Sequence, residues 1–188
     1  MALNLHRIHI ESPRLAVHKI MKTIKSIIAV FIVLAGTAFA VSAQATLTSL
    51  DGAKINVEAQ KGKVVILAVG ASWLPLSTKQ AEFTTALAKK YAGKNVVVYF
   101  VATDSVSPKS KNYATNADIQ KFATASKLTV PVLRDSDGSL TLKRYSIDQL
   151  PSFVILDKDG RQSGEPFGGI DPKYDITIPI SKAVDRLL

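Results

Sequence analysis

The stretch Leu150-Pro151-Ser152-Phe153-Val154-Ile155-Leu156-Asp157-Lys158-Asp159-Gly160 decides the fold of this chain of 188 residues. Residues 152–156, directly after the proline, are an apolar run of strand length, which predicts a buried strand. Residues 157–160 have the composition of a tight turn, and residues 161–167 are expected to return as a weaker hairpin partner. A strand that begins at a proline and ends in a hairpin therefore closes the predicted sheet.

Two further apolar runs lie upstream, at residues 64–69 and 96–101. An unbroken run of this length is typical of a strand that is covered on both faces, as in parallel sheets. Between them, residues 77–91 predict a helix, because three large side chains fall four apart on one face: Phe83, Leu87 and Tyr91. The order strand, helix, strand predicts a right-handed crossover between two parallel strands.

The remaining elements are shorter. Asp51-Gly52 predicts a turn between the two strands of an N-terminal β-hairpin. Pro131 favours an edge strand or a strand start for the apolar segment around it. The other expected elements are an exposed loop at 104–115, helices at 116–128 and 176–188, and a short helix or turn at 138–145. Together these patterns predict one α/β domain with a mixed central β-sheet flanked by helices.

The N-terminal part has the pattern of a signal peptide that begins at Met21. Charged residues follow Met21, residues 27–40 are apolar, and small residues come next. The apolar run is 14 residues long, whereas a membrane-spanning helix needs about 20 residues, so an uncleaved anchor is the less favoured alternative. We expect cleavage after Ala40, Ala43 or Ala45, and favour Ala45 because the folded pattern starts immediately afterwards.

Residues 1–20 resemble neither a signal peptide nor a domain, and we interpret them as a non-native upstream extension. The predicted organisation is therefore an extension at 1–20, a signal peptide at 21–45 and a single domain at 46–188. A cleaved signal peptide predicts a periplasmic or secreted protein with no stable membrane span after processing.

The charge of the chain is moderately basic. It carries 24 Lys and Arg against 15 Asp and Glu, a formal net charge of +9. In residues 46–188, 19 basic and 14 acidic side chains remain, a net charge of +5 that is spread along the chain. Scattered lysines are typical of a solvated surface rather than of a nucleic-acid stripe, so we expect no nucleic-acid partner.

Some residue types are missing from the predicted domain. The chain has no cysteine, and its three histidines and two methionines all precede residue 46. Without a thiolate there is no thiol nucleophile or disulfide, and without imidazole there is neither a base near neutral pH nor the usual zinc or copper ligand set. We therefore expect no catalytic residue, no metal site and no cofactor.

The order of these pieces resembles the thioredoxin superfamily, in particular the secreted thiol–disulfide oxidoreductases (redoxins) of the TlpA/ResA type. The resemblance covers nearly all of residues 47–188 and is carried by five segments: 50–52, 61–65, Ala71-Ser72-Trp73 with the tetrapeptide after it, 131–135 and 150–160. It implies a thioredoxin-like fold with an N-terminal β-hairpin extension. It also implies that Pro151 is cis and that Leu150 presents its main chain to an extended substrate strand.

The chain departs from that family at its redox motif. The family has Trp-Cys-x-x-Cys, whereas this chain reads Trp73-Leu74-Pro75-Leu76-Ser77. A glutamate that the family often places three residues later, where it assists proton transfer, is Gln80 here, and an amide does not titrate. Loss of both thiols and of the proton carrier indicates that the chemistry has been abandoned and that the protein is not an enzyme.

Several residues admit two interpretations. Ser77 is a candidate nucleophile, but the predicted domain has no histidine to activate it, so a helix cap in the capping box 77–80 is favoured. If the helix instead begins at Ser72, Pro75 lies in its first turn. Trp73 is either an exposed contact anchor or a packing residue.

Other candidate side chains favour structural roles. Asp104, Asp135 and Asp137 match no calcium-loop pattern and are interpreted as solvated turn residues. Tyr91, Tyr99 and Phe100 are expected in the core and not on a base-stacking surface.

The sequence thus predicts a redox-inactive binding module of the cell envelope that holds a polypeptide or another protein. The expected binding residues are those of the former redox motif and the proline strand: Trp73, Leu74, Pro75, Leu76, Ser77, Leu150 and Pro151. Two alternatives stay open. One is an oxidoreductase or antioxidant protein in cell redox homeostasis that uses an external thiol or cofactor, and the other is a structural subunit of an envelope assembly.

Overall fold

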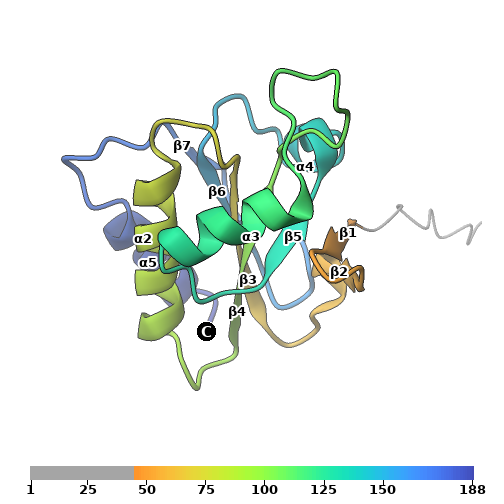
Figure 1. Cartoon of the computed structure of the whole chain (residues 1–188). Coiled ribbons are helices and arrows are strands. Elements are labelled where there is room, and N and C mark those ends of the chain that lie inside the picture. The colour runs from red at the N-terminus through yellow and green to blue at the C-terminus, as the bar shows by residue number, and fades with distance from the viewer. Residues whose placement is uncertain (1–44) are drawn as a thin grey trace, which may run out of the picture. The chain divides into compact units, whose positions relative to one another are not determined.

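Residues 45–188 are described by the computed structural model, and a mixed sheet with strand order β2-β1-β5-β4-β3-β6-β7 lies at their centre (Figure 1). The strands are β1 Thr46–Ser49, β2 Lys54–Asn56, β3 Val64–Gly70, β4 Val96–Ala102, β5 Val132–Arg134, β6 Ser152–Leu156 and β7 Phe167–Gly168. The helices are α2 Ser77–Lys90, α3 Asn116–Ala125, α4 Thr141–Arg144 and α5 Thr177–Asp185, with 3-10 turns η1 Val57–Ala59 and η2 Ser136–Gly138. None of the helices within this part of the chain has the length and apolarity needed to cross a membrane.

The centre of the sheet is the crossover that the apolar runs predict. β3 and β4 pair in parallel from Val64↔Val96 to Gly70↔Ala102, and α2 connects them. β6 pairs antiparallel with the other side of β3. All residues of β3 and β6 are buried, which explains why their sequences show no alternation between apolar and polar residues. The predicted thioredoxin-like α/β arrangement is confirmed.

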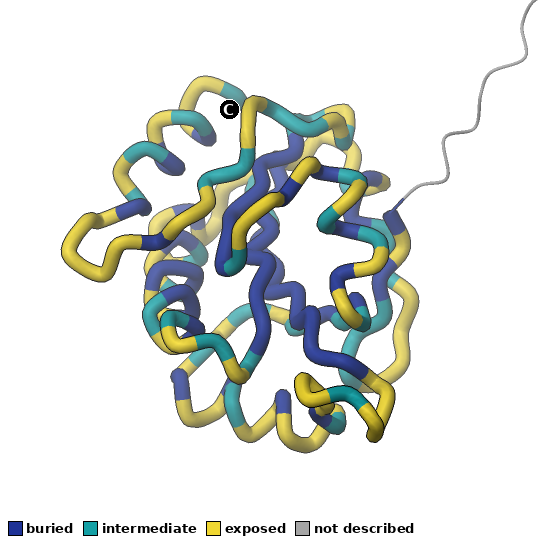
Figure 2. The backbone as a smooth tube through the Cα atoms, turned by 90° about the horizontal axis from the view of Figure 1, so that it is seen from above, coloured by how far each residue is buried: buried dark blue, intermediate teal, exposed yellow. Residues whose placement is uncertain are grey.

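Alternate residues of the central strands face two separate hydrophobic clusters. One cluster joins Ile66 and Phe100 to buried side chains of α2, α3 and α5. The other joins Leu67 and Val101 to the N-terminal hairpin and to Tyr145, which follows α4. Figure 2 shows the buried strands enclosed by half-exposed helices and exposed loops. Each fully buried Leu, Ile or Phe side chain contributes about 1.5–3 kcal/mol, so the stability of this cysteine-free domain comes from these two clusters.

The N-terminal hairpin forms as predicted and extends the sheet beyond β5. β1 pairs antiparallel with β2 around the turn at Asp51-Gly52, where Gly52 has φ of +94°. A positive φ of this kind favours glycine. Ala45, directly before β1, is fully buried, and its carbonyl accepts a hydrogen bond from Val57 N at 3.0 Å.

A buried carboxylate connects this hairpin to α4. Glu58 accepts hydrogen bonds from Arg144 Nη2 at 2.7 Å, Tyr145 Oη at 3.1 Å and Ala45 N at 3.3 Å. Burial alone would raise the pKa of Glu58, but these donors and the Arg144 charge hold the pKa below its ordinary value. The pKa of Tyr145 is raised, first by burial and then by the Glu58 charge. This cluster joins the turn after the hairpin to α4, in addition to the pairing of β1 with β5.

Three expectations about elements need correction or completion. The predicted hairpin partner at 161–167 is almost absent, because only Phe167–Gly168 pairs with β6, apart from an isolated bridge between Leu156 and Gln162. Pro131 marks a strand start and not an edge, since β5 lies between β1 and β4. The predicted signal peptide and the extension at 1–20 lie outside the described residues, except for Ala45.

Candidate functional site

The former redox motif and the proline strand lie at the same edge of the sheet. β3 ends at Gly70, and the motif loop, residues 71–76, follows it. β6 begins at Ser152, directly after the cis bond between Leu150 and Pro151. Because β3 and β6 are antiparallel with Val69 opposite Ser152, the end of one strand lies beside the start of the other. The cis proline that the resemblance implies is present.

The side chains of these two segments differ in exposure. Trp73 is 52% exposed and Pro75 is also exposed, so the contact-anchor interpretation of Trp73 fits its position better than packing does. Leu74, Leu76 and Leu150 are half-buried. Two further predicted binding residues, Ser77 and Pro151, are buried, so their side chains lie under the surface that a partner would contact. The exposed part of the site is therefore apolar and uncharged.

Ser77 does not form the predicted capping box. It is the first residue of α2, and the N-cap position is Leu76, which makes no side-chain cap. The Ser77 hydroxyl instead donates to the carbonyl of Ala71 in the preceding loop, and Ser77 is only 1% exposed. The alternative helix start at Ser72 is also wrong, since turns occupy 72–76. The cap does not form because the Ser77 hydroxyl donates to the Ala71 carbonyl, and because the Gln80 side chain is buried and donates to carbonyls of β3 and β6.

Asp104 contributes to the site, although the sequence suggested a solvated turn residue. It is fully buried at the start of the loop that follows β4. Its carboxylate accepts the backbone N–H of Ser72 at 3.0 and 3.1 Å, and the Ser72 hydroxyl also donates to it. The first turn of the motif loop is thus bound to a neighbouring strand's loop. No local signal could have identified this contact, because the partners are 32 positions apart.

The second aspartate of the predicted set is also buried, whereas the third is exposed as expected. Asp135 is 5% exposed, and its carboxylate accepts hydrogen bonds from Leu140 N and Thr141 N at the start of α4. Asp137 is exposed. The correction has a simple cause: Asp135 satisfies the free N–H groups at a helix start, which is a common use of aspartate.

Arg134 holds the 105–115 loop next to this edge. Its Nη2 donates to three backbone carbonyls, those of Ser105, Asp104 and Ala114, at 2.9–3.3 Å. Its Nη1 donates to Asn116 Oδ1 at 2.8 Å. The base of the loop is therefore fixed, while Val106 and Tyr113 are exposed farther along it.

The main chain of Leu150 is available for pairing. Within residues 45–188 neither its N–H nor its carbonyl takes part in a backbone hydrogen bond. A free donor and acceptor beside an apolar surface is the arrangement that an extended peptide uses when it adds to a protein as a strand. This capacity depends on backbone groups and needs no thiol.

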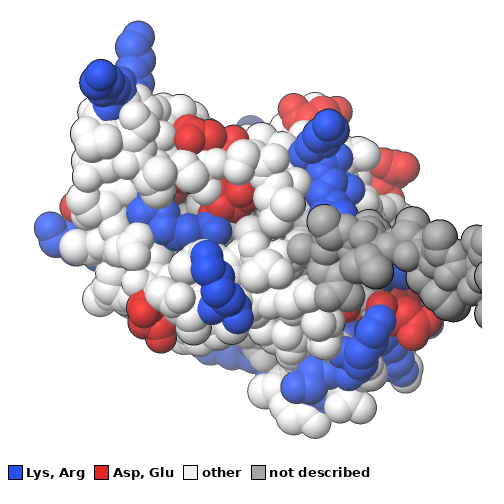
Figure 3. Space-filling view, turned by 90° about the vertical axis from the view of Figure 1, so that its right-hand side faces the viewer, with Lys and Arg blue, Asp and Glu red and all other residues white. Residues whose placement is uncertain are grey.

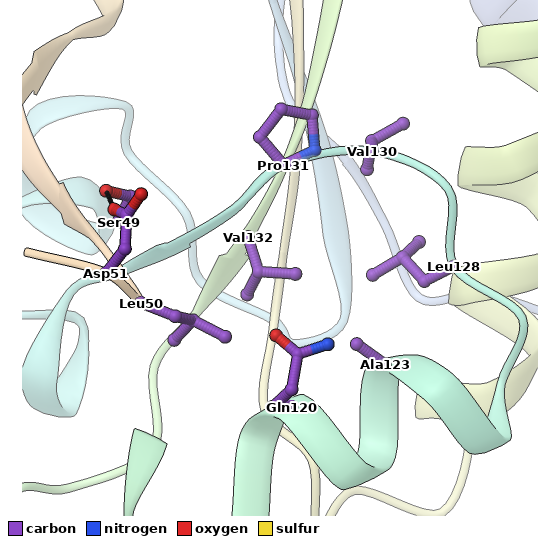
Figure 4. A pocket seen from close by; sticks show the side chains of 9 residues that line it. All are labelled: Ser49, Leu50, Asp51, Gln120, Ala123, Leu128, Val130, Pro131 and Val132. Atoms are coloured by element: carbon purple, nitrogen blue, oxygen red, sulfur yellow. Dashed lines mark hydrogen bonds between the residues drawn. The ribbon is translucent and has the colours of Figure 1, made fainter. Parts of the chain in front are cut away.

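A separate hollow of about 280 Å³ lies between α3, the start of β5 and the β1–β2 turn (Figure 4). Leu50, Leu128 and Val132 point into it, and Gln120 approaches from α3. None of the predicted binding residues lines it. On the face shown in Figure 3, basic and acidic side chains are interspersed. Among the described residues, no three His, Cys, Asp or Glu side chains are grouped so that they could hold a metal ion.

Comparison with known proteins identifies the family. A family model described as the AhpC/TSA family matches residues 39–161. Thiol-disulfide oxidoreductase ResA of Bacillus thuringiensis subsp. konkukian is 30% identical over 115 residues. The match covers 61% of this chain and 61% of the length of that relative. Soluble secreted antigen MPT53 of Mycobacterium tuberculosis is 31% identical over 134 residues, which cover 68% of this chain and 69% of that protein.

Solved structures give the same result for the fold. The exposed lipoprotein thioredoxin Etrx1 of Streptococcus pneumoniae has a TM-score of 0.60 and 28% sequence identity, covering 77% of this chain and all of that chain. The chain described here, with no cysteine in its sequence and a thioredoxin-like fold, therefore belongs to the AhpC/TSA family.

Proposed function

We propose that this protein is a redox-inactive binding module that holds an extended polypeptide segment at the edge formed by the motif loop and Leu150. The observation that carries the proposal is the combination of a free Leu150 main chain with an exposed apolar surface where the family has its thiols. Strand addition supplies main-chain hydrogen bonds, and pockets for alternate side chains supply selectivity. Trp73 and Leu74 supply apolar contact area next to that pairing position.

The site of action in this proposal is the periplasm or the cell exterior. The charged, apolar and small-residue order of residues 21–45 supports export. A relative that covers two thirds of the chain is named a soluble secreted antigen, which agrees with that expectation.

Titration with an unfolded polypeptide tests the binding function. The protein, expressed from the full chain and purified as the host processes it, is titrated with reduced and S-alkylated α-lactalbumin, and backbone amide resonances are followed. We expect shifts confined to residues 71–76 and to Leu150 and its neighbours. Trp73→Ala should weaken binding about tenfold, as is usual for a contact anchor, whereas Leu188→Ala, which removes an exposed apolar side chain at the C-terminus, should not. Shifts scattered over other surfaces would refute the proposal.

The names of the relatives suggest the competing function, thiol–disulfide exchange. Such an activity needs a thiolate that attacks a disulfide sulfur, and this chain has no cysteine to provide one. An insulin-reduction assay with dithiothreitol separates the two functions. We expect no rate above the dithiothreitol background, and catalytic turnover would overturn the proposed function.

A further inference from the structure

Gln80 is a fully buried polar side chain beneath the candidate site. It lies in the first turn of α2, and its Nε2 donates to two backbone carbonyls, that of Val69 at 3.0 Å and that of Ser152 at 3.0 Å. Both amide hydrogens are therefore used. Its Oε1 has no hydrogen-bond partner among the described residues.

The two acceptors belong to the two segments that form the site. Val69 lies two residues before the motif loop, and Ser152 directly follows Pro151. One side chain thus connects the end of β3 to the start of β6, at the point where each strand leaves the sheet. A shift of either segment would break one of the two hydrogen bonds.

The space for this side chain is built into β3. A Cβ atom at position 70 would lie 2.1 Å from Gln80 Oε1, so the glycine at that position makes room for the amide. The role also requires an amide. An ionised glutamate has no donor for either carbonyl, and a protonated glutamate has one donor where glutamine has two.

We propose that Gln80 is the positioning residue that holds the motif loop and the Leu150–Pro151 segment in one arrangement, and that it does so equally at acid and neutral pH. The proposal rests on the proposed function, because a fixed arrangement of both segments is what a strand-pairing surface needs. Preorganisation of this kind raises affinity by lowering the cost of ordering on binding.

The environment of Gln80 supports independence from pH. Its hydrogen-bonding neighbours on β3 and β6 are backbone carbonyls. On its own helix, Lys79 and Glu82 pair with each other at the surface at 2.9 Å. Beyond β4, the carboxylate of Asp104 is occupied by Ser72. None of these charged groups contacts the Gln80 amide.

The test compares Gln80→Glu with Gln80→Met by amide NMR, without ligand, from about pH 5 to about pH 8, the range through which a buried carboxyl of raised pKa titrates. We expect wild-type resonances of Trp73 and Leu150 to be constant over this range. In Gln80→Glu both should shift with one common midpoint, because ionisation of one carboxyl removes its single donor and places a charge beside both carbonyls. Gln80→Met should show shifted but pH-independent resonances. Separate midpoints, or no response at Leu150, would overturn the proposal.

Two further measurements keep the inference testable if Gln80→Glu does not fold. In the wild type, the Gln80 side-chain amide protons should exchange slowly with solvent, and rapid exchange would refute the clamp. Gly70→Ala should displace the amide and shift resonances in both segments.

Binding gives a separate measurement on a folded Gln80→Glu variant. With S-alkylated α-lactalbumin as the probe, its affinity should fall as the pH rises through the carboxyl pKa and level off above it, while the wild type stays constant. If the loops respond as expected but the probe does not bind, the positioning role stands and the proposed function fails.

Discussion

Replacement of Glu58 by glutamine tests the polar contact that holds the N-terminal hairpin to the domain. The variant keeps the shape of the side chain but removes the charge that Arg144 and Tyr145 face. Removal of one partner from a buried ion pair costs about 3–5 kcal/mol. Two features lower this figure: the Arg144 side chain is 27% exposed, and the amide oxygen still accepts one hydrogen bond. We therefore expect a loss of about 2–3 kcal/mol in the free energy of unfolding at pH 7.

Thermal unfolding followed by circular dichroism measures this loss. For a domain of this size, 1 kcal/mol lowers Tm by about 2–4 °C, so Tm should fall by about 4–12 °C. Glu165→Gln is the matched control, because Glu165 is exposed and the chemical change is identical. Surface changes of this kind stay within about 0.5 kcal/mol.

The pH dependence gives the sign of the effect. Because the folded-state pKa of Glu58 is lowered, its ionised form stabilises the fold above the unfolded pKa of about 4.3, and this contribution is lost as the pH falls through the folded value. The difference between wild type and Glu58→Gln should therefore be constant from about pH 6 to 8 and shrink below about pH 4.3. An equal Tm loss in both variants, or a difference that grows on acidification, would refute this account of the contact.

Three more predictions concern the motif loop and the N-terminus. Leu74→Cys combined with Ser77→Cys should form a disulfide, measured as loss of titratable thiol, and should gain some insulin-reduction activity. Two free thiols in a folded variant would show that the motif has been assigned to the wrong residues. Asp104→Asn should weaken the hydrogen bonds to Ser72 and lower the free energy of unfolding by about 1–2 kcal/mol, with faster amide exchange confined to 71–76. Asp148→Asn, at an exposed position, should change neither quantity, and unchanged exchange in Asp104→Asn would contradict the contact. The burial of Ala45 and its two hydrogen bonds argue against the cleavage after Ala45 that the sequence favoured. Mass spectrometry of the processed protein should therefore find an N-terminus at or before Ala45, from cleavage after Ala40 or Ala43, and a chain starting at Thr46 would contradict this.

Sequence patterns were sufficient for the central strands of the sheet and for placing the motif loop beside the proline strand. The runs at 64–69 and 96–101 contain only apolar residues, and such segments have few alternatives to a strand buried on both faces. The motif and the proline strand were placed together by resemblance, and the Val69↔Ser152 register brings them to one edge. These features depend on local composition and on element order, which a sequence displays directly.

The polar contacts beneath the site could not be predicted in the same way. Ser77 and Gln80 match a capping box in sequence, yet the Ser77 hydroxyl donates to Ala71 in the preceding loop. The Gln80 amide donates to Val69 and Ser152, two carbonyls that the pairing of β3 with β6 brings together. Glu58 and Arg144 are 86 positions apart, and neither stands out from the other charged residues. Asp135 is different, because its acceptor role is five to six positions from its donors and a helix-start signal at 140–141 would have revealed it.

The position of Trp73 has a practical consequence for work on this protein. The chain contains one tryptophan, and that indole is half open to solvent in the loop after β3. Intrinsic fluorescence excited in the indole band therefore arises from a single place, on the surface where we expect a partner to dock. With a partner that contains no tryptophan, a change in its emission wavelength or quenching reports events at that surface, so occupancy can be followed with unlabelled protein and no engineered dye.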